Sequence, residues 1–331
     1  MWEWFQQGIT GLSELPGYLL DANKRIYGLY LLGALLLAIP AFYLKYGQFR
    51  WRDFGRYLFN PKIWWHQSAK LDYGLFLLNK PLKALMFAPF IVTMVPIAMG
   101  LSGALESLFG VIPPLSQNEA VVIASFTLLL FLLDDFTRFL LHYLLHKVPF
   151  LWDYHKVHHS ARVLTPMTIY RSHPLESYLY ACRMGLAQGV AVGLGYYLFG
   201  PALSMFDVLG ANVFVFAFNA LGSNLRHSHV WLPFGDRIEK WWISPAQHQV
   251  HHSDNPAHFD RNLGSALAVW DRLFGTLIKS SEVKRVRFGV GRGDPGHQTM
   301  KQLYLKPFTD NWQRIKPRLS KKAPVATSQM D

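Results

Sequence analysis

The sequence contains a single cysteine, Cys182, which lies within an apolar run of the 331-residue chain. A lone cysteine excludes an intrachain disulfide, and it excludes metal, iron–sulfur and redox motifs built from several thiols. The chain also lacks a glycine-rich dinucleotide fingerprint. Any redox chemistry is therefore expected to depend on a separate electron-donor protein.

Acidic residues are scarce: 21 Asp and Glu stand against 33 Lys and Arg, for a net charge of +12, while 51% of the residues are hydrophobic. The basic residues flank apolar runs as long as the roughly 20 residues that cross a bilayer. This arrangement fits anionic lipid headgroups better than nucleic acid, which we do not expect as a partner. The composition therefore predicts an integral, multi-pass membrane protein.

Five apolar spans can be drawn, at residues 27–44, 84–102, 120–141, 177–199 and 202–221. Lys and Arg are frequent in residues 45–83 and absent from residues 103–119, which places 45–83 in the cytosol by the positive-inside rule. The N-terminus then lies outside, and the chain beyond residue 221 is cytosolic. The expected fold class is all-α, a polytopic membrane bundle of about four to five transmembrane helices with a cytosolic helical cap.

The ends of the chain support the same organisation. Met1–Phe5 has no basic start followed by an apolar core, so we expect an interfacial anchor and no cleavable signal. The polar residues 320–331 should be frayed, and the final Ser-Gln-Met-Asp is no endoplasmic reticulum retrieval signal, which favours a bacterial inner membrane. We divide the chain into residues 1–120 with the first membrane helices, a catalytic domain at 121–280 and a basic cytosolic tail at 281–331.

Histidines are concentrated: 12 of the 14 fall between His142 and His258, in two blocks that the expected topology places in the cytosol. A single pair at helical spacing is more often a hydrogen-bonded core feature than a metal site. Several boxes in one compartment favour a cation bound by their lone pairs, because packed imidazoles would otherwise repel when charged. The boxes are His142-x-x-x-His146, His155-x-x-His158-His159 and His248-x-x-His251-His252.

The number and type of these side chains bear on the metal. All-nitrogen ligation suits zinc, iron, copper or nickel, and eight or more histidines exceed the four positions of a structural zinc, so two ions are predicted. His227 and His229 follow the fifth expected span as it re-enters the cytosol, and they are candidates to complete the second ion's shell.

Two further residues are candidates for positions behind the ligands. His173 fits equally well as a helix-entry residue or as support for a ligand. Asp135 lies seven residues before His142 on one helical face, where it would either orient an imidazole or pair with Arg138. We expect the remaining histidines at the surface or interface: His66, His258 and His297.

Motifs outside the boxes point to a known family. They are His173-Pro-Leu-Glu176, His227-Ser228, Asn262-Leu-Gly264 and Trp270-Asp-Arg-Leu-Phe-Gly-Thr276. Together with Asp135 and the boxes, they resemble the fatty acid hydroxylase and sterol desaturase superfamily of membrane di-iron enzymes, over about residues 134–290. The resemblance implies two iron ions held by nine histidines: His142, His146, His155, His158, His159, His227, His248, His251 and His252.

The same resemblance implies an activity. The enzyme would use O2 as cosubstrate and a separate protein as electron donor to remove hydrogen from an unactivated C–H bond of a membrane lipid, such as a fatty acyl chain or a sterol. Hydroxylation is favoured over desaturation and ether cleavage, and zinc could occupy the site in isolated protein. The sequence leaves the oligomeric state open.

Two other classes use histidine-bound metals at membranes. A zinc hydrolase needs a carboxylate base beside its ligands, as in HExxH, and none of the boxes contains a Glu. A metal transporter would place its ligands near the bilayer midplane, whereas these boxes lie past the ends of the expected spans. The oxygenase is therefore preferred, with a membrane zinc-dependent hydrolase or a metal-binding or transport protein as the alternative.

Overall fold

The computed structural model describes residues 15–87, 92–291 and 294–320, so the expected anchor at Met1–Phe5 and the polar end from residue 321 lie outside it. Within these ranges the chain is mainly helical, with one two-stranded antiparallel hairpin. The α-helices are α2 (Gly28–Tyr46), α3 (Trp51–Leu58), α4 (Pro61–Trp64), α5 (Gln67–Phe87), α6 (Met94–Phe109), α7 (Glu119–Lys147), α8 (Pro149–His159), α9 (Pro174–Phe199), α10 (Val213–Ala220), α11 (Pro245–His251), α12 (Val269–Leu273) and α13 (Met300–Ser320). The 3-10 helices are η1 (Pro16–Leu19), η3 (Pro166–Tyr170), η4 (Ser223–His227), η5 (Pro256–His258) and η6 (Ser280–Glu282), and the strands are β1 (Asp207–Val208) and β2 (Ala211–Asn212).

Helices α2 and α7 are long and apolar enough to cross a membrane, judged by length and composition. Only 28% of the most apolar 18-residue stretch of each helix is buried in the protein, whereas a core helix of a soluble protein is mostly buried. With 29 residues at about 1.5 Å each, α7 is roughly 43 Å long and exceeds the ~30 Å hydrocarbon core. The two helices coincide with the expected spans at 27–44 and 120–141, and they indicate a membrane protein.

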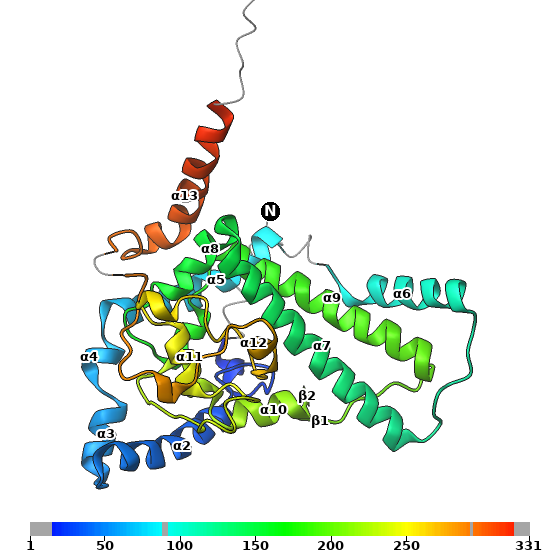
Figure 1. Ribbon diagram of the computed structural model, residues 1–331, viewed down its shortest axis with the longest axis horizontal. Helices are drawn as coiled ribbons and strands as arrows, with labels where there is room; N and C mark the ends of the chain where they lie inside the picture. Colours follow the sequence, from blue (N-terminus) through cyan, green and yellow to red (C-terminus); the bar gives the residue numbers. More distant parts are fainter. Residues whose placement is uncertain (1–14, 88–91, 292–293, 321–331) are drawn as a thin grey trace, which may run out of the picture.

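Helices α6, α9 and α7 lie side by side, with α9 in the middle (Figure 1). Gly185, Gly189 and Gly193 recur every four residues on the face of α9 that meets α6. A Cβ atom built at Gly189 would lie 2.6 Å from the Cβ atom of Ile97, and one at Gly193 would lie 2.7 Å from the Ala98 carbonyl oxygen. The absence of side chains therefore lets the two backbones approach, as is common between helices in lipid.

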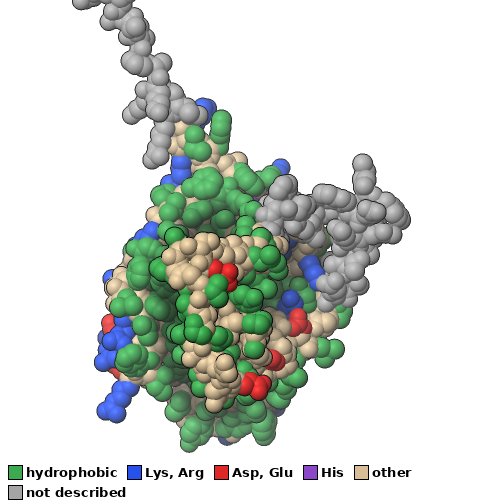
Figure 2. Space-filling model, turned by 90° about the vertical axis from the view of Figure 1, so that its right-hand side faces the viewer, with side chains coloured by type: hydrophobic (Ala, Val, Ile, Leu, Met, Phe, Trp, Pro, Cys, Tyr) green, Lys and Arg blue, Asp and Glu red, His purple; other side chains and the backbone are tan. Residues whose placement is uncertain are grey.

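The outer surface of this helical layer is apolar. Figure 2 looks onto the end of the molecule where α6, α7 and α9 lie, and hydrophobic side chains cover most of it. Leu108 and Phe109 of α6 and Val121 of α7 are among the exposed large apolar residues. Lipid is the medium that such a surface fits.

The expected span at 202–221 is wrong, because it is not a continuous helix. The segment turns back on itself in the β1–β2 hairpin, where Leu209 has φ +54° and Gly210 has φ +79°. The Asn212 Oδ1 atom then accepts a hydrogen bond from Phe214 N at 3.0 Å, which starts the eight-residue helix α10. Eight residues cover about 12 Å, far less than a bilayer core.

The expected span at 84–102 also differs from the structure. It is divided between the end of α5 at Phe87 and the start of α6 at Met94, with residues 88–91 outside the described chain. At 16 residues, α6 is shorter than a typical spanning helix. The expected span at 177–199 does lie within one helix, α9.

The expected cytosolic cap is a compact group of short helices held by a buried arginine. The Arg171 side chain is fully buried, and its guanidinium pairs with Asp72 Oδ1 of α5 at 2.8 Å. It also donates to the Val157 carbonyl of α8 at 2.9 Å and to Ser160 Oγ at 2.8 Å. Because these partners come from α5 and from α8 with its C-terminal cap, this one side chain ties both helices to the end of η3.

Candidate metal centre

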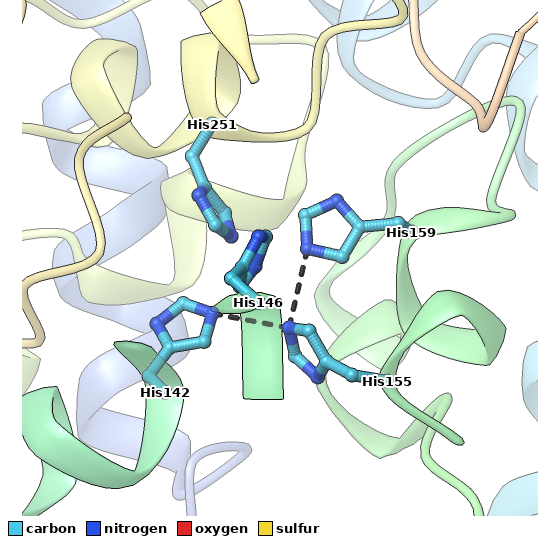
Figure 3. A group of neighbouring side chains, drawn as sticks. All are labelled: His142, His146, His155, His159 and His251. Carbon is cyan, nitrogen blue, oxygen red and sulfur yellow. Dashed lines mark hydrogen bonds between the residues drawn. The ribbon is translucent and has the colours of Figure 1, made fainter. Parts of the chain in front are cut away.

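Nine histidines meet in two adjacent groups, and the candidate ligand atoms within each group lie within 4.8 Å of one another. Figure 3 shows the five imidazoles of the first group directed at a common centre. The rings of His159 and His252 stack across the boundary between the groups, with centroids 4.7 Å apart. The first group contains His142, His146, His155, His159 and His251, and the second contains His158, His227, His248 and His252.

The two HxxHH boxes are shared between the groups in a crossed manner. From α8, His155 and His159 join the first group while His158 joins the second. From α11 and its C-terminal cap, His248 and His252 join the second group while His251 joins the first. On a helix, residues i and i+4 lie about 40° apart around the axis, whereas i+3 lies about 100° from i+4. One box can therefore serve two centres.

Five histidines in the two groups turn Nδ1 outward to an oxygen atom. An oxygen of a carbonyl or carboxylate can only accept, so each Nδ1 carries the proton and the lone pair of Nε2 faces the group. This tautomer is the one that a metal ion requires. The contacts are His142 to Leu263 O (2.7 Å), His146 to Asp260 Oδ1 (3.2 Å), His155 to Glu176 Oε1 (2.9 Å), His158 to Arg171 O (3.1 Å) and His251 to Arg261 O (2.8 Å).

His248 differs from these five. Its Nδ1 atom lies 2.7 Å from the Arg226 guanidinium, which also donates to the carbonyl oxygens of Ser265 and Gly264. A guanidinium has no lone pair, so Nδ1 accepts and the proton of a neutral His248 sits on Nε2. Binding of a cation at that nitrogen would displace the proton.

The loop at residues 260–264 supplies two of the accepting carbonyls. Asp260 has φ +57° and Asn262 has φ +54°, values that Asp and Asn tolerate better than most residues. The Asp271 carboxylate accepts hydrogen bonds from Leu263 N and Gly264 N, both at 2.7 Å. A Cβ atom at Gly264 would lie 2.6 Å from that carboxylate, so the Asn-Leu-Gly motif and Asp271 fit each other.

The chemistry of the two groups fits resident metal ions. Burial lowers the pKa of His155 and His158 to about 3, so both are neutral at physiological pH and retain a lone pair. The Nε2 atoms of His146 and His251 are buried with no hydrogen-bond partner. A buried acceptor without a donor is costly unless a cation binds it.

Three other expected site residues lie elsewhere. Asp135 orients no imidazole: its carboxylate accepts from the amides of Ala266 (2.8 Å) and Leu267 (3.1 Å) and from the indole N–H of Trp270 (2.9 Å). Nor does it pair with Arg138, whose partner is Asp134 at 2.9 Å. Asp135 thus holds the loop that follows Leu263 and affects His142 only through it.

His173 and His229 are not members of either group. His173 is the helix-entry residue, because its Nδ1 atom accepts from Leu175 N at 3.2 Å and caps α9. His229 packs on the Tyr57 ring, with centroids 4.8 Å apart, and its Nε2 atom lies 2.8 Å from the Tyr57 carbonyl oxygen. Of the histidines expected at the surface, His258 and His297 are buried instead, against Ser253 Oγ (2.9 Å) and Asp294 (2.6 Å).

The carboxylates of Glu176 and Asp260 are parts of the site that the sequence did not indicate. Glu176 is buried, and it lies 21 residues from the imidazole that it contacts. Asp260 is shared between His146 and Lys147, which are 114 and 113 residues away. The regular spacing of residues along a helix or strand cannot predict contacts between residues that are so far apart in the sequence. The His-Pro-Leu-Glu motif includes Glu176, but it does not indicate which side chain Glu176 contacts.

A cavity of about 370 Å³ reaches the histidines from one side. Members of both groups line it, including His142 and His155 of the first and His158, His227 and His248 of the second. Apolar side chains from α5 and η3 form other parts of its wall, among them Leu75, Phe76 and Ile169. The cavity gives a small molecule access to both groups at once.

Comparisons with known proteins agree with this geometry. A family model described as fatty acid hydroxylase matches residues 127–276. The chain is 29% identical over 164 residues to an alkylglycerol monooxygenase from Danio rerio, covering 49% of this chain and 32% of that protein. It is 30% identical over 156 residues to an ornithine lipid hydroxylase from Rhizobium tropici, covering 47% of this chain and 43% of that protein.

A cholesterol 25-hydroxylase from Mus musculus is 29% identical over 184 residues, covering 50% of each chain. No solved structure matches the chain significantly. The matched part spans between about a third and a half of these relatives. The match to the fatty acid hydroxylase family model covers residues 127–276, somewhat less than half of the chain, and this stretch carries every histidine of the two groups.

Proposed function

We propose that the protein is an O2-dependent lipid hydroxylase with two iron ions, one in each histidine group. The observation that carries this proposal is the pair of adjacent all-histidine groups, in which five of the nine imidazoles donate an outer Nδ1–H to an oxygen atom. Neutral imidazoles with inward lone pairs suit a redox-active divalent metal, and no cysteine is available to favour another type of centre. Two iron ions bound here would supply the oxidation of an unactivated C–H bond by O2.

The chain's own residues would position the ions and the substrate. Glu176, Asp260 and the carbonyls of the 260–264 loop fix the ring orientations, because each accepts an Nδ1–H bond. Burial of most of the imidazoles limits contact with bulk water, and the cavity gives a substrate access to histidines of both groups. The named relatives act on lipids, and we extend that substrate class to this chain. Hydroxylation is our preferred outcome over desaturation or ether cleavage.

The proposal includes a topology and a partner. We place the histidine groups on the cytosolic side, with α7 crossing the membrane and emerging before His142. Electrons would arrive from a separate protein, since the sequence has no dinucleotide or iron–sulfur motif. A bacterial inner membrane is the proposed location.

Metal content is the first test. Protein purified in detergent from iron-57-enriched cells should contain about two iron ions per chain, coupled in the Mössbauer spectrum, as expected for one ion per group. Persistent zinc, with no activity gained on iron reconstitution, would contradict the oxygenase and favour a hydrolase or a structural site.

His251→Ala tests the ligand assignment. We expect the variant to lose metal and lipid oxidation while it remains in the membrane, because His251 belongs to the first group but lies outside the apolar helices. His66→Ala is the matched control, since His66 lies in neither group. Unchanged metal content and turnover in His251→Ala would refute the assignment.

A further inference from the structure

The cavity at the histidines has an unusual charge balance. Its lining includes five cationic side chains and one carboxylate, that of Glu176. Neutral lipid chains and sterol rings would be bound better by apolar walls than by this charged lining. The cations are Arg25, Lys80, Lys83, Arg138 and Arg226.

Three of these cations form no ion pair with any residue that the structure describes. Arg25 donates to Asn219 Oδ1 and to Ser223 Oγ, both neutral. Arg226 donates to two carbonyls and to His248, and its Nε atom is buried without a partner. Lys83 makes neither a hydrogen bond nor an ion pair within the described chain. By contrast, Arg138 pairs with Asp134, a carboxylate that it shares with Arg183.

Both arginines lie beside the same aromatic ring. The guanidinium of Arg25 is 5.5 Å from the centroid of the Phe218 ring, and that of Arg226 is 5.4 Å from the same centroid. Asn224, which also lines the cavity, donates to the Arg25 carbonyl at 2.8 Å and fixes that segment next to η4. Two like charges near one ring repel each other, and an anion bound beside them would offset that repulsion.

Buried charge without a counter-charge is costly. Two divalent ions held by neutral imidazoles would add further positive charge to the same space. Glu176 cannot compensate for all of it, because its Oε1 atom is already engaged with His155. A negatively charged ligand would offset this charge.

We propose that the substrate is an anionic amphiphile whose phosphate or carboxylate group enters this cavity and binds among Arg25, Lys83 and Arg226. The hydrocarbon part would lie against Leu75, Phe76 and Ile169, beside the histidines. The inference deepens the proposed function, on which it rests, by naming the chemical class of the lipid. The inference also means that the headgroup is bound and recognised inside the protein and not at the bilayer surface.

The test compares three ligands with the same chain: hexadecyl phosphate, palmitate and hexadecan-1-ol. Their dissociation constants are measured by calorimetry on metal-loaded protein in a non-ionic detergent at physiological salt. At least one anion should bind about tenfold or more tightly than the alcohol, since charge-assisted bonds in a buried site are strong. A preference for hexadecyl phosphate alone indicates a phosphate headgroup, and one for palmitate alone indicates a free carboxylate.

Variants on one helix locate the anion. Lys83→Gln should reduce the preference several-fold, whereas Lys70→Gln should not, because Lys70 is exposed on α5 and does not line the cavity. Arg25→Gln serves as a second variant in case Lys83→Gln misfolds. Equal affinity for the alcohol and both anions in the wild-type protein would overturn the inference, as would a preference that both cavity variants leave unchanged. Metal content measured on the same samples tests the proposed function separately.

Discussion

At the scale of single residues, the candidate site depends as much on oxygen atoms behind the histidines as on the histidines. His155 and Glu176 form the most buried example, with exposed side-chain fractions of 3% and 5%. The carboxylate accepts the Nδ1–H of the imidazole at 2.9 Å and so presents Nε2 to the first group. A carboxylate in this position also makes the imidazole a stronger donor to a metal.

Glu176→Gln tests this support. The amide keeps the size of the side chain but removes its charge, so we expect metal affinity to fall by about 10- to 100-fold. Release of metal to a chelator at neutral pH measures the effect. Glu119→Gln is the control, because Glu119 is exposed in the first turn of α7, far along the chain from either group. Equal retention in both variants would show that Glu176 does not support the metal.

His173 predicts a pH effect on stability. Burial lowers its pKa from 6.5 to about 4, so the ring stays neutral and caps α9. The unfolded chain then binds the proton more readily, and the free energy of unfolding should fall as pH drops from 6.5 toward 4, by at most about 1.4 kcal/mol per pH unit.

His173→Asn removes the titrating group but retains a capping side chain. The melting temperature of the metal-loaded variant should therefore decline less between pH 7 and pH 5 than that of the wild-type protein. Parallel declines would show that His173 is already protonated or that its cap is unimportant.

At the scale of elements, hydrophobic runs predicted helices well where no residue interrupts them. The runs at 27–44, 120–141 and 177–199 lie in α2, α7 and α9. The run at 202–221 had the composition of a span but not its continuity, because the β1–β2 turn and the cap at Asn212 intervene. The average composition of a stretch of residues does not show where local hydrogen bonds interrupt a helix.

The histidine boxes show the same limit. Their spacing indicated that members of a box share a helix, and the structure places all nine of the residues named by resemblance in two groups; their binding of iron remains a prediction. Which group each histidine enters depends on how α8 and α11 are placed by tertiary packing, which spacing along the sequence does not show. Asp135 was misplaced for a similar reason, since its backbone-amide partners lie 131 and 132 residues away.

Helix packing at α6 and α9 is testable with matched glycines. Gly189→Ala should destabilise the protein by about 1–3 kcal/mol, because the new Cβ would meet Ile97 and the Met94 carbonyl oxygen, 2.9 Å away. Gly103→Ala, on the exposed face of α6 with no atom within 4 Å, should be neutral or stabilising. Thermal unfolding in detergent measures both. A stability loss confined to Gly103→Ala would contradict the close packing.

At the scale of the whole molecule, a membrane segment and a histidine-bearing cap are joined through α7. The helix carries exposed apolar residues such as Val121, Leu128 and Leu132, and His142 and His146 lie near its C-terminal end. The N-terminal end of α9 returns to the same place with Glu176. The histidine groups therefore lie at one end of this helix pair, where the proposed lipid substrate would have to reach them.

Reporter fusions test the topology. A reporter placed after Glu106 should be found outside and one placed after Arg162 inside, because α7 lies between these positions. Both reporters on one side would mean that α7 does not cross, and the histidine groups would then need another route to a membrane substrate.

The crossed use of the two boxes makes the centre indivisible during synthesis. Each group draws at least one residue from α8 and one from α11 or its cap. A ribosome that has released α8 but not His251 and His252 has completed neither group, however much of the membrane segment is already inserted. The chain as far as α8 holds four histidines of the first group but only His158 of the second, so the second group forms almost entirely after α8 has been made. Two fragments cut between α8 and α11 would complete both groups only when they are combined.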